Sequence, residues 1–379
     1  MNDFEVLHTD GGCGARRGLL TTARGNVETP AFCPVGTAGA VKGISPRQLD
    51  ETGAGIILAN IYHLLLRPGV EVVEKLGGLH KFMSWDKPIL TDSGGYQIFS
   101  LGWSLKRSKA RPGAPPLSKV DDDGVEFVSH IDGSKVYLNA ELATEIQNRL
   151  GGDIIMCFDQ CTPFPCEDSQ LRKAVERTIN WAKRSKKAHG NAGQLLFGIV
   201  QGGTDLELRS YCASELMKQD FDGYAIGGLS VGEERDDMIR TVVHTAGLLP
   251  ESKPRYLMGV GMPADIIAAV KAGVDMFDCV LPTRNGRNAF AFTDNGPVRM
   301  RNNAHISDAR PIEADCDCYC CRNFGRGTLR HFFNVGEMLG PMLVSLHNLR
   351  FYQRLMAKIR EAIERDEFAD WADEQLKND

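Results

Sequence analysis

The sequence predicts an α/β protein built on a (β/α)8 TIM barrel, in which eight parallel strands alternate with helices and close into a cylinder. Short apolar runs rich in Ile, Val, Leu and Phe recur without alternating polar residues, which is typical of buried parallel strands. Amphipathic stretches of helical length lie between most of these runs, and this alternation predicts a parallel sheet. The 379 residues exceed the ~250 that one barrel needs, so insertions are also expected.

Eight runs fit barrel strands, and that number favours a closed barrel over an open sheet. The runs are residues 31–35, 56–59, 88–92, 153–158, 195–200, 223–227, 255–260 and 275–280. The helices predicted between them include residues 45–51, 169–188, 206–218, 235–247 and 263–272.

Two connections are too long to be plain loops. Residues 95–138 contain two alternating segments around Asp132-Gly133-Ser134, a pattern that predicts a β-hairpin. Residues 282–343, after the eighth strand, contain four closely spaced cysteines, and residues 345–379 predict a closing helix with a polar tail. We therefore interpret residues 1–379 as one barrel domain with two insertions. Residues 106–119 are expected to form a loop.

Charge is unevenly distributed along the chain. The net charge of -5 argues against a nucleic-acid partner when it is averaged over all residues. However, residues 282–360 contain twelve Lys and Arg against six Asp and Glu. A basic region in an acidic chain suits a polyanion bound on one face. A solvated surface with a random drift of charge would give the same count.

The sequence also predicts where the protein resides. No apolar run approaches the ~20 residues needed to cross a bilayer, so no membrane partner is expected. Residues 1–18 lack the basic-then-apolar pattern of a secretion signal, which favours the cytoplasm. Eleven scattered cysteines, an odd number, do not resemble a disulfide framework in that reducing compartment.

Polar residues stand where the predicted strands end, and strand ends carry the chemistry of this fold. They are Asp92, Asp159, Gln201 and Asp278, with glycines close by at 227–228 and 259–261. Two carboxylates that flank an acetal-like C1 carbon can break a glycosidic bond through a covalent intermediate. A third carboxylate and an amide can read the polar edge of a purine. The alternative is that these aspartates cap helices, a common role in βα loops.

Cys316, Cys318 and Cys321 are spaced closely enough to surround a metal ion. Structural zinc takes four thiolate or imidazole ligands in a tetrahedron, so one more ligand is required. The candidates for the fourth ligand are Cys320, His331 and His347. Cys320 adjoins Cys321, which would strain simultaneous ligation. A fully coordinated zinc would stabilise the fold and leave no position for substrate. Free buried thiols are the alternative.

The ordered motifs resemble those of the tRNA-guanine transglycosylases, in their bacterial queuosine-pathway form, over nearly the whole chain. The matching segments are Thr91-Asp92-Ser93-Gly94-Gly95-Tyr96-Gln97, Ser129-His130-Ile131-Asp132-Gly133-Ser134, Phe158-Asp159-Gln160-Cys161, Val200-Gln201-Gly202-Gly203, Gly227-Gly228-Leu229-Ser230-Val231-Gly232-Glu233, Phe277-Asp278-Cys279-Val280-Leu281-Pro282-Thr283-Arg284, the three spaced cysteines and His347-Asn348-Leu349-Arg350.

This resemblance implies an enzyme of queuosine biosynthesis. It would exchange guanine at wobble position 34 of G-U-N tRNAs (Asp, Asn, His and Tyr) for 7-aminomethyl-7-deazaguanine, called preQ1. Asp278 would be the nucleophile that forms a covalent aspartyl-ribose intermediate, and Asp92 the general acid/base. The base would contact Ser93, Tyr96, Asp159, Gln201, Gly228, Leu229 and Met258. The anticodon loop would contact Arg284 and Arg287 in a basic second insertion.

The resemblance also implies a metal and an assembly. His347 would be the fourth ligand of one structural Zn²⁺ per subunit, and the family is usually a homodimer. Val231 and Cys161 match the bacterial pattern, whereas relatives that accept the larger base queuine tend to have glycine in place of Val231. We therefore predict a preference for preQ1, with acceptance of queuine as the alternative.

Two further classes of function compete with this interpretation. A non-catalytic RNA-binding subunit would lack the nucleophile, whereas Asp278 and Asp92 are both present here. A carbohydrate-directed glycosidase could use the same carboxylate pair. The chain contains only four Trp and has a basic insertion, which argues against a sugar-binding groove.

Overall fold

The computed structural model describes residues 3–99 and 118–377. Eight parallel strands form a closed barrel, in which each strand pairs with two neighbours and β6 pairs with β10 to complete the circle. The strands are β4 (Ala31–Gly36), β5 (Ile57–Ala59), β6 (Ile89–Thr91), β10 (Ile154–Met156), β11 (Leu195–Val200), β12 (Gly223–Ile226), β13 (Arg255–Leu257) and β14 (Met276–Cys279). The predicted barrel is confirmed, and each predicted run overlaps one of these strands. Most of the loop at 106–119 lies outside the described residues.

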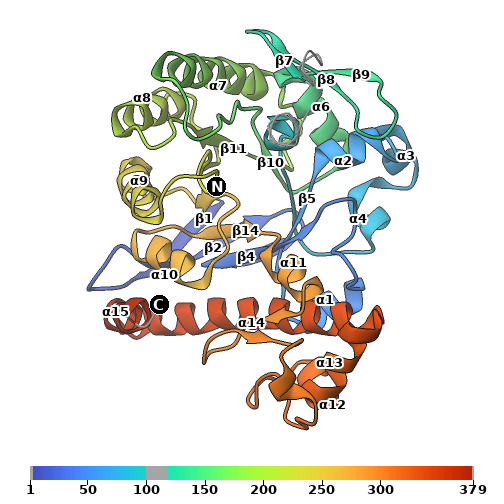
Figure 1. Ribbon diagram of the computed structural model, residues 1–379. Helices are drawn as coiled ribbons and strands as arrows, with labels where there is room; N and C mark the ends of the chain where they lie inside the picture. The colour runs from blue at the N-terminus through green and yellow to red at the C-terminus, as the bar shows by residue number, and fades with distance from the viewer. Residues whose placement is uncertain (1–2, 100–117, 378–379) are drawn as a thin grey trace.

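Helices surround the barrel (Figure 1). They are α1 (Pro46–Glu51), α2 (Ile61–Leu66), α3 (Val70–Lys75), α4 (Gly78–Met83), α6 (Ala140–Leu150), α7 (Asp168–Ala188), α8 (Leu206–Met217), α9 (Arg235–Leu248) and α10 (Pro263–Lys271). Helix α7 buries Leu171, Val175, Thr178 and Ala182 at helical spacing, which explains why its position could be predicted. Among the described residues, no helix combines the length and the hydropathy that a membrane crossing requires.

A small antiparallel sheet closes one end of the barrel, and the sequence patterns did not predict it. Its strands are β1 (Phe4–Thr9), β2 (Arg16–Thr22) and β3 (Gly25–Thr29). Arg16 forms a buried ion pair with Asp275, with Nε–Oδ1 and Nη2–Oδ2 distances of 2.9 and 2.6 Å. Because Asp275 immediately precedes β14, this sheet lies at the amino ends of the barrel strands. The carboxyl ends remain available for a site.

The first insertion contains the expected hairpin. Strands β8 (Gly124–Val128) and β9 (Lys135–Asn139) pair in antiparallel fashion, and β7 (Ser118–Val120) adds a third strand. The second insertion contains α11 (Leu281–Arg287), β15 (Phe290–Ala291), β16 (Val298–Arg299), a 3-10 turn η1 (Asn303–His305), α12 (Tyr319–Asn323) and α13 (Arg326–Val335).

The closing segment differs from the helix and polar tail expected at 345–379. Helix α14 (Leu339–Glu364) begins earlier, and α15 (Phe368–Lys377) follows after a break. In Figure 1, α14 is the long red helix between the barrel and the lower helices α12 and α13. Asp366 has a left-handed φ of 57° at the break, and its Oδ1 accepts a hydrogen bond of 3.0 Å from the backbone N–H of Gly11. No Gly or Pro marks this break, so only the tertiary contact reveals it.

Candidate active site and metal centre

A cavity of about 460 Å³ opens at the carboxyl ends of the barrel strands. Its lining includes all the predicted catalytic and base-contacting residues: Asp92, Asp278, Ser93, Tyr96, Asp159, Gln201, Gly228, Leu229 and Met258. They lie at or within a few residues of the carboxyl ends of barrel strands, which meet at one mouth. Arg284 also lines the cavity, whereas Arg287 does not.

Asp278 lies on β14 with one carboxylate oxygen held and the other unengaged. Its Oδ1 accepts hydrogen bonds from the Tyr256 hydroxyl at 2.5 Å and the Gly259 backbone N–H at 2.9 Å. Oδ2 accepts none from the described residues. Enclosure by the protein raises the pKa of Asp278, and the bond from Tyr256 opposes that rise. The group is therefore an oriented carboxylate with a free oxygen.

Asp92 follows β6 and faces the start of α2. The backbone N–H of Ile61 donates to Oδ1 at 2.9 Å, and the Asn60 amide donates to Oδ2. Burial raises the pKa of Asp92 to about 7, and the charge of Asp278 adds to the rise. A carboxyl group with a pKa near neutrality can both donate and accept a proton, as general acid/base catalysis requires.

Asp159 and Gln201 form a polar subsite in the same cavity. The Gln201 Nε2 donates to Asp159 Oδ2 at 2.7 Å, and the Ser93 hydroxyl donates to Oδ1 at 3.1 Å. Burial raises the pKa of Asp159 to about 6, so the group still carries negative charge at neutral pH. A carboxylate beside an amide can accept from and donate to the edge of a purine.

Glycine is required at position 228. Gly228 has a φ of 67°, and a Cβ there would lie 2.1 Å from Gln201 Oε1. The next residues form a tight loop around the Glu233 carboxylate, which accepts hydrogen bonds from the backbone N–H groups of Ser230, Val231 and Gly232. The backbone can therefore approach a ligand beside the amide of Gln201.

Tyr96 and Met258 offer apolar surface to the cavity. Tyr96 is 46% exposed, a high fraction for a large aromatic side chain, and Met258 packs against the main core. Cys161 also lines the cavity, whereas Val231 does not. Val231 packs against the core cluster that contains Cys161. Any effect of Val231 on the size of the bound base therefore passes through the loop after Leu229.

Arg284 and Arg287 lie one turn apart on α11. Neither forms an ion pair with a carboxylate in the described part of the chain. Nη1 of Arg287 is buried without a hydrogen-bond partner. The pKa of Arg287 is lowered mainly by its burial and, to a smaller extent, by the positive charge of Arg284. Two uncompensated cations beside a cavity favour an anionic ligand.

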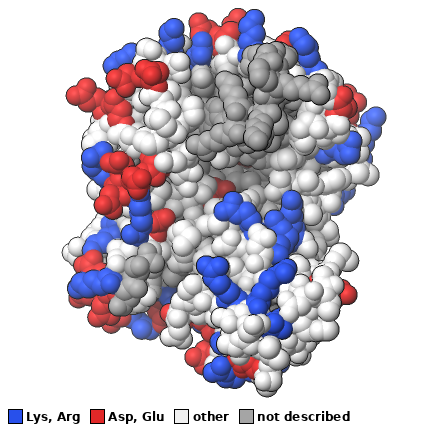
Figure 2. Space-filling view, viewed as in Figure 1, with Lys and Arg blue, Asp and Glu red and all other residues white. Residues whose placement is uncertain are grey.

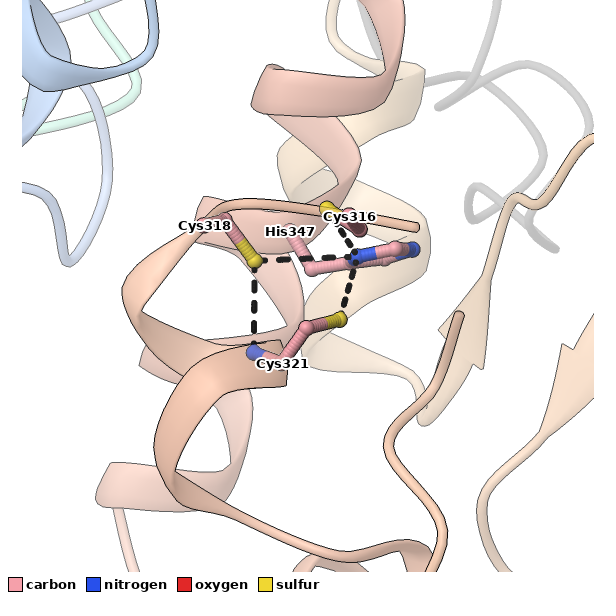
Figure 3. A group of neighbouring side chains, drawn as sticks. All are labelled: Cys316, Cys318, Cys321 and His347. Atoms are coloured by element: carbon pink, nitrogen blue, oxygen red, sulfur yellow. Dashed lines mark hydrogen bonds between the residues drawn. The ribbon is translucent and has the colours of Figure 1, made fainter. Parts of the chain in front are cut away.

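Three cysteines of the second insertion lie around His347, as Figure 3 shows. The sulfur and nitrogen donor atoms of Cys316, Cys318, Cys321 and His347 all lie within 4.8 Å of one another. The three sulfurs lie 3.5, 3.8 and 3.3 Å from His347 Nδ1. Adjacent ligands of a tetrahedral zinc with ~2.3 Å sulfur and ~2.1 Å nitrogen bonds are about 3.6 Å apart, so the group can hold a metal ion of that size.

Local structure positions these four side chains. Cys318 is the N-cap of α12 and its sulfur accepts the backbone N–H of Cys321, which orients both thiols toward α14. His347 lies in the third turn of α14, and its Nε2 lies 2.8 Å from the carbonyl oxygen of Phe292. A carbonyl can only accept, so Nε2 carries the proton and Nδ1 is free to ligate. Cys320 and the exposed His331 are not in the group.

Sequence reasoning missed Asn60, Tyr256 and Glu233. Asn60 follows β5, so the rule of polar strand ends could have found it. Tyr256 lies inside a buried strand and resembles a core residue, so no local signal reveals its bond to Asp278. Glu233 ends the glycine-rich motif that begins at Gly227, but its three backbone partners are visible only in the folded loop.

A family model described as queuine tRNA-ribosyltransferase matches residues 10–379, which include every cavity and metal-centre residue named above. The chain is 50% identical over 375 residues to a queuine tRNA-ribosyltransferase of Francisella tularensis subsp. novicida, covering 99% of this chain and 98% of that protein. It is 51% identical over 368 residues to the enzyme of the same name from Thiobacillus denitrificans, covering 97% and 96%.

Proposed function

This chain belongs to the queuine tRNA-ribosyltransferase family, and on that premise we propose that it is a pentosyltransferase acting on tRNA. It exchanges guanine at wobble position 34 of G-U-N tRNAs for preQ1 in queuosine biosynthesis. The observation that carries this proposal is that Asp92 and Asp278 share a cavity with the purine-reading pair Asp159 and Gln201. A cavity that contained only Asp92 and Asp278 would suit any glycosidic bond.

The first half-reaction removes guanine. Oδ2 of Asp278 attacks C1′ of the ribose while the C1′–N9 bond breaks, which leaves a covalent aspartyl-ribose ester. Protonated Asp92 donates its proton to the departing base. Asp159, Gln201, Ser93 and the backbone at Gly228 and Leu229 hold the base edge, and Tyr96 and Met258 cover its faces.

The second half-reaction inserts preQ1. Asp92, now a carboxylate, removes the proton from N9 of the incoming base, and N9 then attacks C1′. The ester bond breaks and Asp278 returns as a carboxylate. One glycosidic bond replaces another, so the exchange needs no external energy source. The target base must leave its stack, which costs less in an anticodon loop than in a duplex.

Zinc is the metal that we propose for the Cys316, Cys318, Cys321 and His347 group, with one ion per subunit. Three thiolates and one imidazole form a donor set that zinc prefers, and they complete its tetrahedron. The bound ion would cross-link the second insertion to α14. The neighbouring α11 carries Arg284 and Arg287, which we propose contact the anticodon loop.

We treat residues 1–379 as one domain, because α14 contacts the barrel strand β4, the N-terminal sheet and the second insertion. A homodimer is the assembly that we expect, to be checked by the mass of the protein in solution. A tRNA substrate also agrees with a cytoplasmic location.

Incorporation of labelled guanine tests the reaction class directly. The protein is incubated with a G-U-N tRNA and labelled guanine, and with the same tRNA bearing adenosine at position 34 as a control. Label should enter the first tRNA and not the second. Binding of the first tRNA without incorporation would contradict the proposal and favour a non-catalytic RNA-binding subunit.

A further inference from the structure

Within the described residues, Arg299, Arg301 and Arg330 of the second insertion lack the ion pairs that neighbouring arginines form, as do Arg284, Arg287 and Arg322. Arg310, Arg326, Arg350 and Arg354 each contact a carboxylate. Arg299, Arg301 and Arg330 contact none among residues 3–99 and 118–377. An acidic chain that leaves these charges uncompensated has a local surface suited to an external anion.

Aromatic rings and asparagines hold these three side chains in place. The guanidinium carbon of Arg299 lies 5.9 Å from the ring centre of Phe290, and that of Arg301 lies 5.9 Å from the ring centre of Phe333. Such contacts position a guanidinium group while its N–H donors stay available. Arg330 donates from Nε to the Asn302 carbonyl at 3.1 Å and from Nη2 to Asn303 Oδ1 at 2.7 Å.

A series of contacts connects this surface to the cavity. Arg284 lines the cavity from α11, and α11 contacts β15. Phe290 of β15 is the cross-strand partner of Arg299 on β16. Phe333, which holds Arg301, shares α13 with Arg330. In Figure 2, lysine and arginine side chains gather below the hollow on the face shown, over the region of α11.

We propose that Arg299, Arg301 and Arg330 bind the phosphate backbone of tRNA outside the anticodon loop. This rests on the proposed function, which places the wobble nucleotide in the cavity and its neighbours at Arg284. RNA that continues past α11 then reaches β16 and α13. Phe333 is only 4% exposed and Phe290 is partly buried, so these rings are not platforms for stacked bases. Guanidinium groups without base-stacking surfaces favour phosphate, which they can bind in bidentate fashion.

The variant Arg299→Gln/Arg301→Gln tests this proposal. Affinity is measured over a range of salt concentrations for a full-length G-U-N tRNA and for a hairpin that keeps the anticodon loop on a shortened stem. Because the variant removes two phosphate-binding cations, affinity for the full tRNA should fall about tenfold and the slope of log K against log salt should decrease by roughly 1.5 to 2. Affinity for the hairpin should stay within about twofold of wild type.

Arg24→Gln/Arg172→Gln is the matched control. Both residues are exposed, and neither contacts a carboxylate in the described ranges. This control removes the same charge far along the chain from the second insertion, so the salt dependence should equal that of wild type. An equal loss of affinity in the control would indicate that net charge alone is responsible, and would overturn the proposal.

The remaining outcomes separate this proposal from the proposed function. The Arg299→Gln/Arg301→Gln variant could bind tRNA with the affinity and salt dependence of wild type. If wild type still incorporates guanine, this result would overturn only the proposal for the arginine surface. An equal loss of affinity for the hairpin would place the contacts in the loop and overturn it too. If the variant changed its mass in solution but kept the salt dependence of tRNA binding, the surface would instead contact a second copy of the chain, and the proposal would be overturned. Absence of guanine incorporation by wild type would instead reject the proposed function.

Discussion

Asp92 and Asp278 share one cavity. The pKa of Asp92 is raised to about 7, mainly by burial and in smaller part by the negative charge of Asp278. Burial also raises the pKa of Asp278. Asp278 has one oxygen held by Tyr256 and Gly259, which stabilises its ionised form. A nucleophile and a proton carrier can thus operate side by side near neutral pH.

Replacing Asp278 by asparagine removes the proposed nucleophile and keeps the shape of the side chain. We expect the Asp278→Asn variant to lose guanine exchange by more than about a thousandfold. It should also form no covalent RNA adduct in a denaturing gel, while its affinity for tRNA stays within a few fold of wild type. Retained exchange would eliminate the assignment of Asp278.

The Tyr256→Phe variant tests a positioning role that only the fold reveals. Loss of the hydroxyl removes the bond that lowers the pKa of Asp278, so less of the nucleophile is ionised at a given pH. We expect kcat to fall by about ten- to a hundredfold, because a hydrogen bond to a charged group contributes roughly 1.5 to 3 kcal/mol. The decrease should be larger at pH 6 than at pH 8.5, with the KM for tRNA little changed.

Tyr224→Phe is the control for that experiment. Tyr224 is buried in the adjacent strand β12 but does not line the cavity. Removal of its hydroxyl should leave the pH profile of kcat unchanged. A pH-independent decrease of kcat in Tyr256→Phe, or an effect confined to KM, would mean that Tyr256 does not act through Asp278.

Asp92 should make the protein less stable as pH rises. Its pKa is near 3.9 in an unfolded chain and about 7 in the fold, so its protonated form stabilises the fold at low pH and that contribution is lost as pH rises through 7. A shift of this size corresponds to about 4 kcal/mol. Asp92→Asn cannot titrate, so its gain in free energy of unfolding over wild type should be larger at pH 8 than at pH 5. Urea unfolding measures both values, and an equal gain at both would contradict the raised pKa.

Cysteine variants separate metal ligation from simple burial. Cys318→Ser should reduce bound zinc from about one ion per chain to nearly none and cost at least about 3 kcal/mol of stability. Cys320→Ser should keep its zinc, because Cys320 is buried beside the group without belonging to it. Elemental analysis and unfolding measure both effects. A zinc-free Cys318→Ser protein as stable and active as wild type would argue against a structural metal.

We propose that Val231 influences the choice of base through the loop after Leu229. Wild type should exchange preQ1 far better than queuine. Val231→Gly should raise the ratio of queuine to preQ1 exchange by about tenfold, because a smaller side chain would loosen the packing of this loop, and small changes in pocket size alter specificity by that order. Val231→Ala should give an intermediate ratio. Competition assays with purified protein measure these ratios, and comparable use of queuine by wild type would contradict the preference.

Local patterns account for most of the fold. Each barrel strand and the helices α1 and α7 to α10 were predictable because apolar runs and helical spacing are properties of neighbouring residues. The N-terminal sheet was not predicted, since its burial depends on Arg16 meeting Asp275, which lies 259 residues further along the chain. The break before α15 depends likewise on Asp366 meeting Gly11.

The site, like the fold, was predictable from sequence where it depends on neighbouring residues and not where it depends on tertiary contacts. Residue order alone was enough to identify Asp92, Asp159, Gln201 and Asp278 as strand-end groups and Cys316, Cys318 and Cys321 as candidate metal ligands, because strand ends and ligand spacing are local. The tertiary structure decided which histidine joins the cysteines, which hydroxyl holds Asp278 and how far each carboxyl pKa is raised. Those properties depend on burial and on distances between segments far apart in sequence, and both arise only when the chain packs.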